Sequence, residues 1–200
     1  MSVPKSSDLP KIGQRVTHYL LLLFLIMTGL LIGLIQNGRF DPQPVGELQW
    51  EAAPVTAEIA ADPQLIWLER PLPPPPYTIR LTAAWQSGHP DTAIGLALGD
   101  ESDYIVTAVA PTGYFTPPTP NPHTMTSIPQ LPWPHINQLD TPNEIWLDVT
   151  ADSITIRLNR ELYGQEAIRS PAAGQMGLWG MSWAETAVVT WQRLELFYDP

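Results

Sequence analysis

A run of 17 residues without a charge, YLLLLFLIMTGLLIGLI from Tyr19 to Ile35, constrains this chain more than any other feature. With the three residues before it, the run reaches about 20 residues, which as a helix spans a hydrocarbon core of about 30 Å. The apolar core of a signal peptide is shorter, about 7–15 residues, and ends at small residues. This run exits through LIGLIQNGRF instead. We therefore predict a retained transmembrane helix over 16–36, with a cleaved signal peptide as the alternative.

The apolar run also contains Gly29 and Gly33, which form a G-x-x-x-G pattern. This spacing lets two membrane helices approach closely, so the two glycines are candidates for helix packing. Glycines are also common in membrane helices for no such reason. The pattern alone therefore leaves both interpretations open.

The charges on either side of the run predict its orientation. Lys5, Lys11 and Arg15 precede it and Arg39 follows it, so we expect residues 1–15 to form a cytoplasmic tail and the C-terminal part to be extracytoplasmic. From Asp41 onward there are six arginines, 19 acids and no lysine, a formal charge of −13. Such acidity argues against a nucleic-acid partner. The absence of cysteine excludes disulfides and thiolate metal sites.

Beyond the helix, the composition changes twice. Residues 37–63 contain spaced prolines and small residues, which predict an extended connector, although the part around Leu48 to Trp50 suits pairing at a sheet edge. From Gln64 the pattern is one of short alternating strands, such as YTIRLTAAW from Tyr77, separated by turn residues. Residues 64–200 are therefore predicted to be an all-β domain, an antiparallel β-sandwich or barrel.

A proline-rich segment interrupts the strands between Pro111 and Pro142, with nine prolines. Proline lacks the N–H that a central strand donates, so the segment is expected to be a long loop or a set of short edge strands. Long loops in compact domains are often functional. Its aromatic and histidine side chains are therefore the first candidates for ligand binding, with anchoring of the loop as the alternative: Tyr114, Phe115, His123, Trp133 and His135.

The last 58 residues carry a resemblance to a known family, in the order NEIWLDV, SITIRLNREL, GQMGLWG and AVVTWQRLELF. This order resembles the C-terminal half of concanavalin A-like lectin/glucanase domains, in their laminin-G-like and 3-keto-glycoside hydrolase-like members. The likeness extends over Tyr77 to Ala110, and it implies a jelly-roll sandwich of two antiparallel sheets. The family's usual Asn-Gly turn is here Asn159-Arg160, and because arginine is poorly suited to positive φ, a different turn is expected.

Lectins, hydrolases and adhesion modules all use this fold, so enzyme function needs its own residues. No E-x-D-x-E strand occurs, and Glu144 and Asp148 lie about 13 Å apart along one strand at about 3.3 Å per residue. That separation excludes the close carboxylate pair of retaining glycosidases. The acids Asp100, Glu101 and Asp103 are weak candidates for binding Ca²⁺, because their turn lacks the spacing of a calcium loop. The sequence indicates no other cofactor.

Eight tryptophans are many for such a domain, and exposed rings can stack on sugars. Trp146 is the best candidate for an exposed ring because its same-face neighbours on the strand are acids. The leading hypothesis is a membrane-anchored, non-catalytic module of the bacterial cell envelope that binds glycan or protein. An accessory subunit of a membrane protein complex and a membrane-anchored glycoside hydrolase are the alternatives.

Overall fold

The computed structural model describes residues 9–120, 127–167 and 174–200, with the backbone alone for residues 9–15. Helix α1 runs from Leu9 to Gln36. Its portion Val16–Gln36 has a mean hydropathy of 2.4 and is long and apolar enough to cross a membrane. The chain divides into two compact units between Gln43 and Pro44, each described by itself.

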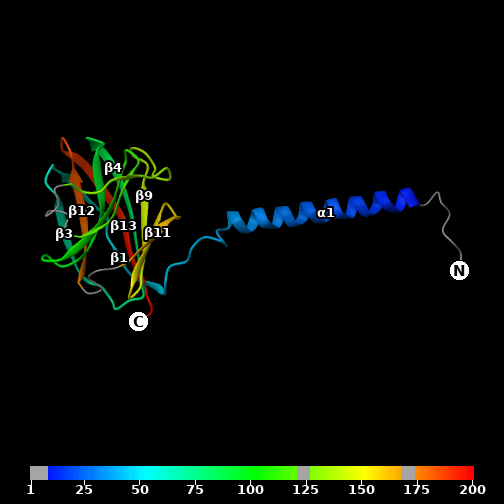
Figure 1. Cartoon of the computed structure of the whole chain (residues 1–200), viewed down its shortest axis with the longest axis horizontal. Coiled ribbons are helices and arrows are strands. Elements are labelled where there is room, and N and C mark those ends of the chain that lie inside the picture. The colour runs from blue at the N-terminus through cyan, green and yellow to red at the C-terminus, as the bar shows by residue number, and fades with distance from the viewer. Residues whose placement is uncertain (1–8, 121–126, 168–173) are drawn as a thin grey trace. The chain divides into compact units, whose positions relative to one another are not determined.

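The second unit consists of antiparallel strands (Figure 1). The strands of the described residues are β1 (Glu47–Ala52), β2 (Val55–Ile59), β3 (Gln64–Pro71), β4 (Tyr77–Gly88), β5 (Thr92–Gly99), β6 (Tyr104–Ala110), β7 (Tyr114–Pro120), β8 (Leu131–Pro132), β9 (Asn143–Val149), β10 (Ser153–Leu158), β11 (Glu161–Ala167), β12 (Gln175–Ser182) and β13 (Ala187–Tyr198). Sheet A has the order β1-β13-β4-β9-β10-β11, with β2 also paired to β13, and sheet B has the order β3-β12-β5-β6-β7-β8. The predicted antiparallel sandwich is therefore confirmed.

The second compact unit begins at Pro44, and two strands, β1 and β2, lie within the residues 37–63 that were expected to form an extended connector. Strands β1 and β2 both pair with the last strand, β13, which pairs along its other side with β4. Side chains join this seam too, because the hydroxyls of Thr56 and Thr190 lie 2.9 Å apart. Strand β1 lies where pairing at a sheet edge was expected, around Leu48 to Trp50, whereas the composition of the connector gave no sign of the short strand β2.

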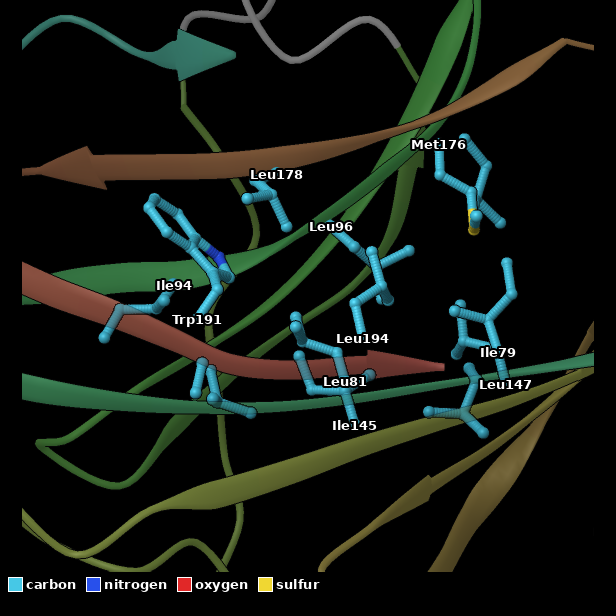
Figure 2. Close-up of a cluster of buried hydrophobic side chains, with 14 of the residues drawn as sticks. Ile79, Leu81, Ile94, Leu96, Ile145, Leu147, Met176, Leu178, Trp191 and Leu194 are labelled. Carbon is cyan, nitrogen blue, oxygen red and sulfur yellow. The ribbon is translucent and has the colours of Figure 1, made fainter. Parts of the chain in front are cut away.

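The core lies between the two sheets (Figure 2). Alternate residues of each strand point inward, so β4 contributes Ile79 and Leu81, and β9 contributes Ile145 and Leu147, all at most 1 % exposed. The indole of Trp191 crosses between the sheets and donates to the carbonyl of Gly95 at 3.0 Å. Because these residues face inward, their neighbours on β4 and β9 form the outer face of sheet A.

The outer face of sheet B carries a second apolar layer, which includes Tyr104 and the fully buried Trp179. Ile128, from the proline-rich segment, packs against this layer. At this point the proline-rich segment is therefore anchored to the sandwich by an aliphatic side chain.

The turn between β10 and β11 keeps the backbone of an Asn-Gly turn without its glycine. Asn159 has a φ of 52° and Arg160 has a φ of 72°, both in the left-handed region that a type I′ turn requires. The expectation of a different turn at this point is therefore wrong. Arg160 adopts a conformation that costs a residue with a side chain about 1–2 kcal/mol.

Candidate functional site

A pocket of about 470 Å³ opens in the proline-rich segment, between the start of β7 and the chain that follows β8. This volume lies within the range of about 300–1,000 Å³ that is typical of small-molecule sites. Its lining residues are Thr112, Gly113, Tyr114, Pro132, Trp133, Pro134, Ile136 and Gln138. None of these residues carries a charge, although the sandwich as a whole is strongly acidic.

The two aromatic walls of the pocket, Tyr114 and Trp133, are positioned by neighbouring strands. Tyr114 is 40 % exposed, and its successor Phe115 is fully buried against Tyr163 of β11, with ring centroids 4.6 Å apart. Trp133 packs on the same Tyr163 at 5.2 Å, and its backbone N–H donates to the carbonyl of Gly113 at 3.0 Å. The two walls are therefore held by core contacts rather than by the loop alone.

A network of asparagine side chains fixes the far end of the loop. Asn143 accepts from the backbone N–H of Asn137 at 2.7 Å and donates back to its carbonyl at 2.9 Å. Asn159 donates to the carbonyl of His135 at 2.6 Å and to the Asn143 side chain at 2.8 Å. Because Asn159 belongs to the β10–β11 turn, these bonds tie the loop to sheet A.

The indole N–H of Trp133 is buried and has no hydrogen-bond partner among the described residues. Buried polar groups usually have a hydrogen-bond partner, so an unpaired donor in a side chain that lines a pocket calls for an explanation. The side-chain amide of Gln130, which does not line the pocket, has the same property. The pocket thus combines two aromatic side chains with one unpaired indole N–H.

The structure brings together most of the residues predicted for the loop. Tyr114 and Trp133 line the pocket, Phe115 lies buried beneath it, and His135 is exposed beside Trp133 with ring centroids 5.5 Å apart. His123 lies outside the described residues. Thr112 and Gln138 also line the pocket, although the sequence analysis did not select them. In the sequence, these two residues stand out only because they lie within the same proline-rich segment.

Trp146 is not the exposed ring that its strand neighbours suggested, because it is only 2 % exposed. Its indole N–H donates to Asp148 at 2.6 Å, and the guanidinium groups of Arg80 and Arg157 lie 5.4 and 6.0 Å from its ring centroid. Both arginines come from neighbouring strands, where each is the register partner of Trp146. Trp146 is therefore corrected from a candidate stacking residue to a structural one.

The acidic turn after β5 is held by its own hydrogen bonds. Oδ1 of Asp100 accepts from the hydroxyl and the backbone N–H of Ser102, at 2.6 and 2.8 Å, and from the N–H of Asp103 at 3.0 Å. The Ser102 hydroxyl is the main cause of a lowered pKa for Asp100. Among the described residues, no group of three or more His, Asp or Glu side chains is placed to hold a metal ion.

No protein-family model matches the chain, and no curated protein matches its sequence. Solved structures do match its fold. Carbohydrate-binding module CBM66 from Bacillus subtilis matches with a TM-score of 0.52 and 13 % identity, over 76 % of this chain and 94 % of that one. The β-fructofuranosidase of Aspergillus kawachii, complexed with glycerol, matches at 0.54 and 8 %, over 76 % of this chain but only 27 % of that one. Galectin LEC-6 of Caenorhabditis elegans matches at 0.45 and 14 %, over 70 % and 94 %. At these identities the likeness shows the fold alone, and that fold is the concanavalin A-like β-sandwich.

Proposed function

We propose that this protein is a single-pass membrane protein whose extracytoplasmic sandwich binds a glycan without cleaving it. The observation that carries the proposal is the uncharged pocket beside Tyr114 and Trp133. Aromatic rings offer flat apolar faces to the C–H groups of a sugar ring, while Thr112 and Gln138 supply hydrogen-bonding groups at its rim. The carbohydrate-binding module with the same fold supports this ligand class. Because the pocket has no charge, the ligand is a neutral glycan.

The hydrogen bonds of Asp148, on β9 of sheet A, support a non-catalytic role for this carboxylate. Asp148 accepts hydrogen bonds from Thr78 at 2.7 Å, from the indole of Trp146 and from Arg157. A carboxylate engaged in this way stabilises the sheet and is poorly placed to attack or protonate a substrate. The match to the fructofuranosidase does not weaken this proposal, because this chain spans about a quarter of that enzyme.

Membrane anchoring rests on α1 and on the charges beside it. The portion Val16–Gln36 is apolar over 21 residues, long enough to span the hydrocarbon core. The basic residues before it favour a cytoplasmic N-terminus, and the acidity of the sandwich favours a location away from anionic lipid headgroups. Intact mass of the purified protein tests this part, because removal of residues up to the end of α1 would identify a cleaved signal peptide.

A glycan array probed with the full chain in detergent micelles tests the binding function. We expect neutral glycans to bind, and Tyr114→Ala to weaken that binding at least about tenfold, a loss of about 1.4 kcal/mol. The matched control is Leu162→Ala, which removes an exposed apolar side chain outside the pocket and should leave binding unchanged.

Three results would contradict the proposal. Equal binding by Tyr114→Ala and the unaltered chain would show that the pocket is not the site. Copurification of other membrane proteins with the full chain, together with an empty array, would instead identify an accessory subunit of a membrane complex. Release of shortened products from any bound glycan would show an enzyme.

A further inference from the structure

Glu144 occupies an unusual position on the outer face of sheet A. Its side chain is 18 % exposed, and its Oε1 is buried without a hydrogen-bond partner among the described residues. The nearest cations are Nε of Arg160, 3.9 Å from Oε1, and Nε of Arg80, 4.0 Å from Oε2. Both distances are too long for hydrogen bonds. Glu144 thus has neighbouring positive charges and unused acceptor capacity.

Arg80 is held rigidly beside this carboxylate. Its Nε donates to Oε2 of Glu195 at 2.7 Å, and its guanidinium lies 5.4 Å from the Trp146 ring centroid and 5.1 Å from that of Phe197. Stacking and the Glu195 bond fix the plane of the guanidinium, while its side chain remains 22 % exposed. Arg80 therefore presents donors in a fixed direction next to Glu144.

Arg160 approaches Glu144 from the other side, at the strained turn between β10 and β11. Glycine would suit its φ of 72°, yet the position carries an arginine that forms an ion pair with Glu144. Its side chain is 58 % exposed, so it can move away from Oε1 without disturbing the core. Backbone strain that persists beside a charged group is a reason to look for a function there.

We infer that Glu144, Arg80 and Arg160 form a second binding site, distinct from the loop pocket, for two adjacent hydroxyls of a sugar ring. One hydroxyl donates to the Glu144 carboxylate once Arg160 swings outward. The adjacent hydroxyl accepts from the guanidinium of Arg160 in its outward position, beside the fixed donors of Arg80. A hydroxyl can do both because it is donor and acceptor at once. The inference rests on the proposed function for its ligand class but uses none of the residues of the pocket.

The test uses the same neutral-glycan array with the full chain in detergent micelles. Glu144→Gln keeps the shape of the side chain and removes its charge, and we expect at least about tenfold weaker binding of some glycans, as for loss of a hydrogen bond to a charged group. Arg160→Gly should weaken the same glycans. Glu69→Gln is the matched control, because Glu69 is an exposed acid on β3 of sheet B, away from this site.

The array separates this inference from the proposed function. Glycans that survive Tyr114→Ala but not Glu144→Gln assign binding to the second site and remove it from the pocket. If Glu144→Gln and Arg160→Gly retain every glycan while Tyr114→Ala loses them, the inference is wrong and the pocket stands. An array with no bound glycan overturns both. Thermal unfolding of each variant shows that a loss of binding is not a loss of folding.

Discussion

Trp133 and Trp146 were both selected from the sequence as ligand-binding aromatic residues, and the structure gives them opposite roles. Trp133 lines an open pocket, and its indole N–H has no partner among the described residues. Trp146 is buried beneath two arginines, and its indole N–H is bonded to Asp148. The difference arises from what the adjacent chain segments place beside each ring. The accessibility of an aromatic residue on a sheet therefore depends on its register partners more than on its own strand.

The largest expected effect comes from removing the buried ring. Trp146→Ala should lower the free energy of unfolding by about 3–5 kcal/mol, as for other large-to-small changes at buried aromatic positions. It also leaves Arg80 and Arg157 without the ring on which they stack. Urea denaturation followed by near-ultraviolet circular dichroism measures the change. Tyr114→Ala, at an exposed wall of the pocket, should stay within about 1 kcal/mol of the unaltered chain.

If the two substitutions cost the same free energy, the contrast between a structural and a ligand-binding aromatic residue would fail. A small effect of Trp146→Ala would mean that the arginines, rather than the ring, hold the outer face of sheet A. A large effect of Tyr114→Ala would mean that the pocket wall is part of the core.

The strand pattern of the sequence predicted the sandwich because alternation along β4, β9 and β10 places their apolar residues on one face. It predicted the loop as a candidate site because prolines disrupt central strands. It did not predict that Arg80 and Arg157 cover Trp146, since both arginines lie on other strands and only the register brings them together. Pairing at a sheet edge was expected around Leu48 to Trp50, where β1 lies, whereas β2 was missed because its role depends on pairing with the last strand of the chain.

A smaller effect is expected at the strained turn that borders the second site. Arg160→Gly should raise the free energy of unfolding by up to about 1 kcal/mol, because glycine adopts a φ of 72° without the strain of a side chain. The lost ion pair with Glu144 offsets little of this gain, since Arg160 is more than half exposed. Chemical denaturation of the full chain in micelles measures the difference.

The adjacent Asn159 gives the matched control for this turn. Asn159→Gly also relieves a positive φ, but it removes the bonds to His135, to Asn143 and to the backbone N–H of Glu144. It should therefore destabilise the sandwich. Stabilisation by both substitutions would show that the asparagine network contributes nothing, and destabilisation by both would show that Arg160 is needed for folding rather than for a ligand.

The smallest expected effect is a pH dependence at Glu144. Burial raises the pKa of its carboxyl above the ordinary value of 4.5, and this effect outweighs the opposing pull of Arg80 and Arg160, while Glu195 adds to the rise. Below the pKa of the unfolded chain, the group is protonated in both states and its contribution to stability is complete. Between the two pKa values, the folded chain keeps this proton and the unfolded chain has lost it. The contribution to stability therefore declines as the pH rises, and it is lost above the pKa of the folded state.

Glu144→Gln removes this titration, so the unaltered chain should lose stability relative to the variant as the pH is raised from below 4.5 towards neutrality. Other carboxyls contribute to both proteins and cancel in the difference, which is measured by urea denaturation at each pH. If the unaltered chain instead gained stability relative to Glu144→Gln as the pH rises, the two arginines would be holding Glu144 firmly as a carboxylate. Glu144 would then belong with Asp148 as a structural partner of arginine, and the contrast between a satisfied and an unsatisfied acid on sheet A would disappear.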